Sequence, residues 1–93
     1  MKYICYFSWE ADTQKQNEGI RRFKETGGQP PKGATLLGRW IHADFSGGVL
    51  LLESNDPKAL AEFGLMWSDV MALKIVPIVE DQDLVEVLER VGR

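Results

Sequence analysis

The chain has 93 residues, of which 44% are hydrophobic and 27% are charged. This length and composition predict one globular domain over residues 1–93 and exclude an intrinsically disordered chain. With 14 acidic against 11 basic side chains the net charge is −3, so the basic surface of a nucleic-acid-binding protein is not expected.

Membrane, metal and nucleotide classes are disfavoured by local features. The apolar runs 49–52 and 75–79 are far shorter than the roughly 20 residues of a membrane span. The N-terminal stretch lacks a signal-peptide cleavage site, so we expect it to be the first element of a cytoplasmic protein. The single cysteine, Cys5, and the single histidine, His42, cannot form a disulfide or a structural zinc site. No glycine pair has the spacing of a phosphate loop, so nucleotide binding is not expected. We therefore expect neither a metal nor a cofactor.

The first half of the chain predicts a strand, a helix and a loop. Residues 2–9 are aromatic and β-branched, with apolar side chains on both faces of the expected strand. Thr13 and Gln16 have the spacing of a capping box, so a helix should begin at Thr13. The helix should end at the glycine pair that opens the loop 27–33, because the two prolines of that loop cannot continue it.

The middle of the chain predicts a hairpin followed by a second helix. Residues 35–44 and 49–53 read as antiparallel strands joined through residues 45–48. Asp56 can then cap a helix that has Pro57 at its first position and apolar side chains at helical spacing. This helix should run over about 57–67.

The last third predicts one more strand and a terminal helix. In the strand 71–79, Pro77 lacks an N–H group and therefore favours an edge of the sheet. The acidic tail from Glu80 then opens a short amphipathic helix. The complete order is that of the ferredoxin-like βαββαβ fold, an α+β class with an antiparallel sheet, helices on one face and a short C-terminal helix.

The face of this sheet that the helices leave open should also be apolar. Residues 49–52 are all apolar, and Lys74 is the only charged residue that interrupts the apolar run of the strand 71–79. With roughly six to eight such side chains at about 1.5 kcal/mol each, the open face leaves on the order of 10 kcal/mol of burial unused. We expect a second copy to cover it as a homodimer, sheet against sheet. The alternative is that the terminal helix folds across it.

Two residues around the hairpin, His42 and Glu53, could carry acid–base chemistry. His42 shares a parity with Trp40, and a two-residue turn would place Glu53 on the same face. A histidine and a carboxylate beside a tryptophan are typical of an acid–base pair in an apolar pocket. The alternative is a solvated histidine at the end of a hairpin, and a three- or five-residue loop would separate the two side chains.

The three tryptophans, Trp9, Trp40 and Trp67, suggest a site for a flat or apolar ligand. The predicted pocket comprises Trp40, His42, Glu53 and Trp67. The alternative is that tryptophans fill the core, above all Trp67 on its amphipathic helix. Arg39 is a candidate for binding an anionic group, although a solvated or ion-paired role is the simpler interpretation.

Several segments resemble one known family. Gly38-Arg39-Trp40 and Trp67-Ser68-Asp69, with the Pro30-Pro31 loop and the acidic tail, resemble a bacterial family of unknown function, DUF3303. This resemblance implies similarity to the dimeric α/β-barrel group, whose ferredoxin-like subunits pair through their sheets, and implies no activity. In the family pattern the histidine directly follows the tryptophan, whereas Ile41 intervenes here. No role is therefore transferred to His42.

These patterns support three hypotheses about function. The first is a homodimer that binds a small apolar or aromatic molecule between sheet and helices. The second is an enzyme of the cofactor-independent monooxygenase or isomerase kind that uses His42 as its base. The third is a purely structural interaction module.

Overall fold

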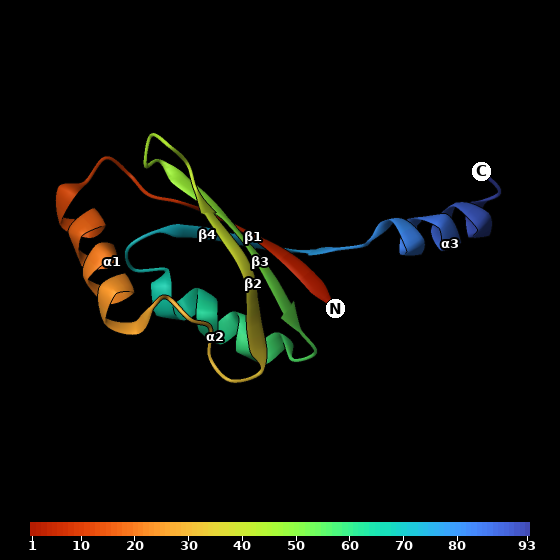
Figure 1. The fold of residues 1–93 in the computed structure, drawn as a ribbon, viewed down its shortest axis with the longest axis horizontal. Helices are drawn as coiled ribbons and strands as arrows, with labels where there is room; N and C mark the ends of the chain where they lie inside the picture. The colour runs from red at the N-terminus through yellow and green to blue at the C-terminus, as the bar shows by residue number, and fades with distance from the viewer.

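The computed structural model describes residues 1–93 and contains four strands and three helices (Figure 1). The strands form one antiparallel sheet in the order β2-β3-β1-β4, and this confirms the ferredoxin-like plan. No helix combines the length and the apolar character that crossing a membrane requires. The elements are β1 (Lys2–Ser8), α1 (Thr13–Thr26), β2 (Ala34–Ile41), β3 (Gly47–Ser54), α2 (Pro57–Trp67), β4 (Ala72–Ile78) and α3 (Asp81–Val91).

The helix ends largely follow the predicted signals. Asp56 caps α2 by accepting from the amide of Lys58, and Pro57 occupies the first turn, as predicted. The start of α1 differs from the capping-box prediction. Its N-cap is Asp12, whose carboxylate accepts from the amides of Gln14 and Lys15, because a carboxylate one residue earlier outcompetes the Thr13 hydroxyl for the free amides.

In the β2–β3 hairpin, β2 ends earlier than predicted and the loop is longer than predicted. β2 ends at Ile41, and residues 42–46 form a five-residue loop in which Phe45 adopts a left-handed conformation with φ 62°. The predicted pairing of Glu53 with Trp40 or His42 is therefore wrong. Trp40 pairs with Val49, and Glu53 pairs with Thr35 at the far end of the strands. A shift in register between Leu36 and Gly38 also reverses the alternation of faces within β2.

The core lies between one face of the sheet and α2. Leu52, Cys5 and Leu50 from the sheet pack against Phe63 and Trp67 of α2, and all five are buried. Burial raises the pKa of the Cys5 thiol to about 11, so this cysteine behaves as a small apolar side chain, as expected. β4 lies at an edge of the sheet, which confirms the prediction made from Pro77.

The other face of the sheet is uncovered. On it the exposed Tyr6 and Trp40 surround half-buried aliphatic side chains, and the Trp40 ring lies against Gly38, where a side chain would meet it. Strand pairing places the following apolar residues on this open face: Ile4, Tyr6, Trp40, Val49, Leu51, Val76 and Ile78. α3 does not fold across it, because the helix leaves the end of β4 and points away from the sheet (Figure 1).

Candidate functional site

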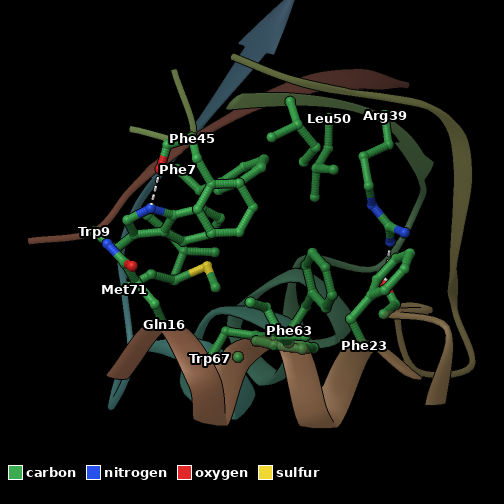
Figure 2. A pocket seen from close by; sticks show the side chains of 15 residues that line it. Phe7, Trp9, Gln16, Phe23, Arg39, Phe45, Leu50, Phe63, Trp67 and Met71 are labelled. Atoms are coloured by element: carbon green, nitrogen blue, oxygen red, sulfur yellow. Dashed lines mark hydrogen bonds between the residues drawn. The ribbon is translucent and has the colours of Figure 1, made fainter. Parts of the chain in front are cut away.

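An apolar cavity of about 200 Å³ lies between α1 and the covered face of the sheet. Eleven of the 15 residues around it are hydrophobic. Figure 2 shows the lining side chains converging from the sheet, the hairpin loop, α1 and α2. The aromatic members are Phe7, Trp9, Phe23, Phe45, Phe63 and Trp67.

The cavity exists because α1 does not pack closely on the sheet. None of the side chains of α1 is buried, and the apolar Ile20 and Phe23 on its inner face remain 37% and 49% exposed. Gly19 leaves the middle of the helix without a side chain, at a position where a Cβ atom would lie 3.9 Å from the Cε of Met71. The sequence therefore builds an amphipathic helix and leaves space under it.

Polar attachments hold α1 in this position at its C-terminal half. Arg22 forms a two-pronged ion pair with Asp69, with one Nη1–Oδ1 distance of 2.8 Å, and also donates to the carbonyl of Met66. Arg39 of β2 donates to the carbonyls of Gly27 and Gly28 at 3.0 and 2.6 Å. Arg22 therefore links α1 to the end of α2, and Arg39 links the end of α1 to the sheet.

The hairpin loop closes the opposite end of the cavity. The Trp9 indole donates to the carbonyl of Phe45, and the two ring centroids are 4.7 Å apart (Figure 2). Trp9 also packs against Phe7 of β1, with centroids 5.6 Å apart. The left-handed conformation of Phe45 turns its side chain toward this cluster rather than into solvent.

One hydrogen-bond donor in the cavity lining has unused capacity. The Arg39 guanidinium lies 5.0 Å from the Phe23 ring centroid and has no carboxylate within ion-pair distance, and burial lowers its pKa. The Trp67 Nε1 also has no hydrogen-bond partner, but it is fully buried in the core and not accessible from the cavity. An acceptor placed beside Arg39 would therefore be stabilised.

The predicted pocket residues do not share one cavity. Trp67 lines the cavity from α2 and packs in the core, whereas Trp40 and Glu53 lie on the open face. His42 is exposed in the hairpin loop, where its Nδ1 is 3.1 Å from the Ser46 hydroxyl. The five-residue loop pairs Trp40 with Val49 and leaves Glu53 at the far end of the open face, while Trp67 lies on the covered side of the sheet.

The comparison with protein families agrees with the resemblance carried by the sequence motifs. The family model described as "Domain of unknown function (DUF3303)" matches residues 1–92. The chain belongs to the DUF3303 family. No curated protein matches this DUF3303 chain.

Sequence reasoning missed most of the cavity lining of this DUF3303 domain. Helical spacing places Phe23 on the inner face of α1 but gives no sign of free space beneath it. Phe45 and Trp9 meet only because the hairpin loop has five residues and a left-handed position, and no local motif indicates that. The solvated or ion-paired role expected for Arg39 is wrong, because its guanidinium donates to two backbone carbonyls.

The attachment of α1 predicts acid sensitivity in the DUF3303 domain. Hydrogen bonds from Arg22 lower the pKa of Asp69, and those from Arg21 and Arg22 lower the pKa of Glu18 to about 2. Because both pKa values are lowered on folding, the ion pairs stabilise the fold above the unfolded values, near 4, and this stability is lost as the pH falls toward 2. Circular dichroism should show a melting temperature that falls over this range and falls less steeply in Asp69→Asn.

The matched control for this acid sensitivity is Glu89→Gln, which removes an exposed carboxylate on α3 that forms no ion pair. It should keep the slope of the original chain. Identical slopes for Asp69→Asn and the original chain would contradict a role of Arg22 and Asp69 in holding α1.

Proposed function

We propose that this domain binds a small molecule, with one or two flat apolar rings and a hydrogen-bond acceptor, in the cavity beneath α1. The observation that carries the proposal is a cavity lined mostly by aromatic and aliphatic side chains, with the guanidinium-bearing Arg39 in its lining. A protein cavity of about 150 Å³ can hold benzene, so a volume of about 200 Å³ suits a ligand of this size.

The lining favours an acceptor, and most of all a carboxylate. Arg39 contributes a positive charge with free N–H groups at one end of the cavity. An aromatic acid would place its rings among the phenylalanines and its carboxylate near Arg39. The desolvation of Arg39 strengthens such an ion pair.

The indole N–H signals provide a direct binding test, with naphthoate as the probe. In a two-dimensional 15N–1H spectrum, the signals of Trp9 and Trp67 should shift on titration, because both residues line the cavity. The signal of Trp40 on the open face should stay in place. Naphthylmethylammonium, which has the same rings but no acceptor, should bind at least about tenfold more weakly, a difference of roughly 1.4 kcal/mol.

A cavity-filling variant supplies the matched control for this titration. Gly19→Leu places a side chain into the space under α1, and Gly64→Leu places the same side chain on α2, where nothing lies within 4 Å. Gly19→Leu should weaken naphthoate binding at least about tenfold, and Gly64→Leu should leave it unchanged. Equal binding by both variants, or a shift of the Trp40 signal alone, would contradict the cavity as the ligand site.

The geometry does not favour acid–base catalysis by His42. Its ring lies outside the cavity lining, and the Ser46 hydroxyl beside it donates to the Asp44 carboxylate at 2.7 Å. A binding role therefore fits the arrangement better than the enzyme hypothesis.

We also propose that the domain is a homodimer whose subunits meet through their open sheet faces. Seven apolar side chains on this face, beside Lys2, Glu53 and Lys74, support the proposal, because an antiparallel sheet face in water carries mostly polar side chains. Pairing of two such faces leaves the cavity under α1 on the outer side of each subunit.

A further inference from the structure

α3 is a complete helix that packs on nothing in its own chain. The side chains of Glu80 and Asp83 cap its start, and the left-handed Gly92 closes its end. Every side chain from Asp81 to Val91 is exposed, although four of them form an apolar stripe along one side of the helix: Leu84, Val87, Leu88 and Val91. A helix of 11 residues is marginal in water by itself, so this stripe requires a partner surface.

The whole chain exposes more surface than a compact monomer of its mass. The accessible surface is 6574 Å², about 1,100 Å² more than the roughly 5,400 Å² expected for a folded monomer of this mass. The radius of gyration is 15.4 Å, against about 12 Å expected for a compact domain of this length. A stable interface buries about 800 Å² on each partner, so this excess, to which α3, the open sheet face and the loosely packed α1 all contribute, is large enough for one protein interface.

The connection to β4 directs α3 away from its own sheet. Only Val79 and Glu80 separate the strand from the helix, and Glu80 has an extended backbone with φ −90° and ψ 170°. An ion pair between Glu80 and Lys2 of β1 holds this link against the end of the sheet. α3 therefore continues outward, as Figure 1 shows, and the side chains of its stripe stay exposed.

We propose that α3 is an exchanged arm, whose apolar stripe packs on a second copy of this chain beside the paired sheet faces. A membrane surface is a poorer partner, because the remaining faces of α3 carry the acids Asp81, Asp83, Glu86 and Glu89 against the single base Arg90. The exchanged arm rests on the proposed homodimer but is independent of the ligand cavity. In this arrangement the dimer interface comprises α3 as well as the open sheet face.

Hydrogen exchange distinguishes an exchanged arm from a free or self-packed helix. In the dimeric chain the backbone amides of residues 85–91 should be protected, because the second copy holds the helix formed. Leu51→Lys, which places a charge on the open face, should release the subunits and lower this protection at least about tenfold. Protection that persists in monomeric Leu51→Lys would overturn the proposal in favour of packing within one chain. Rapid exchange in the intact dimer would overturn it in favour of a free helix.

Sedimentation of two α3 variants provides the second readout. Leu84→Lys lies on the apolar stripe and should raise the dimer dissociation constant at least about tenfold. Gln82→Lys adds the same charge to the opposite side of α3 and should leave the constant unchanged. Equal constants for both variants would contradict the exchanged arm. If the original chain were monomeric, both the homodimer and the arm would fail, whereas naphthoate binding would still test the cavity.

Discussion

Phe63→Ala is expected to lower the free energy of unfolding by about 3–5 kcal/mol, the range for removing a fully buried aromatic side chain. Phe63 is 2% exposed and joins α2 to the sheet side of the core. The effect should be severe because α2 is the only helix that buries side chains against this sheet. A domain of this size has a total stability of roughly 5–15 kcal/mol, so the variant should be close to unfolding at room temperature.

Urea denaturation followed by tryptophan fluorescence measures this loss. Leu65→Ala is the control, because Leu65 lies on the same helix and is 78% exposed. It should change the free energy of unfolding by no more than about 0.5 kcal/mol. A loss below about 1 kcal/mol for Phe63→Ala would show that the core does not depend on α2, since removing a packed phenylalanine is far more costly.

The second large effect is expected at the open sheet face. Sedimentation equilibrium should show the original chain as a dimer and Leu51→Lys as a monomer, with a dissociation constant raised at least about a hundredfold. Leu51 pairs with Ile4 and Gly38 in the middle of the open face, so the lysine charge would be buried against the second sheet. Truncating or charging the centre of an interface typically costs several kcal/mol.

Ala61→Lys is the control for this change of charge. Ala61 is exposed on α2, away from the open face, so its lysine should leave the dissociation constant unchanged. A single subunit observed for the original chain at all concentrations would contradict the homodimer. Dissociation caused equally by Ala61→Lys would instead indicate that net charge, and not the open face, governs association.

The two proposed surfaces lie on opposite sides of the same sheet. The open face carries Trp40 and Tyr6, whereas the cavity uses the covered side and the inner face of α1. Gly19→Leu should therefore block the probe without changing the oligomeric state, and Leu51→Lys should change the oligomeric state without blocking the probe. This separation lets each proposal be tested without the other.

Local patterns sufficed for the order of the elements and for several of their ends. Asp56 before Pro57 marked the start of α2, the Gly27-Gly28 pair marked the end of α1, and Pro77 marked β4 as an edge strand. Each of these signals acts through backbone hydrogen bonds within a few residues, so no information about distant segments is needed. The apolar runs of individual strands likewise predicted the apolar character of the open face.

The site was decided by tertiary structure. The predicted grouping of Trp40, His42, Glu53 and Trp67 failed because a five-residue loop pairs Trp40 with Val49, leaves Glu53 at the far end of the open face and places His42 outside the strand, while Trp67 lies on the covered side. Nor does any local pattern reveal that α1 stands away from the sheet or that α3 points outward from β4. Caps and periodicity depend on neighbouring residues, whereas the cavity and the unpaired helix depend on how distant elements pack.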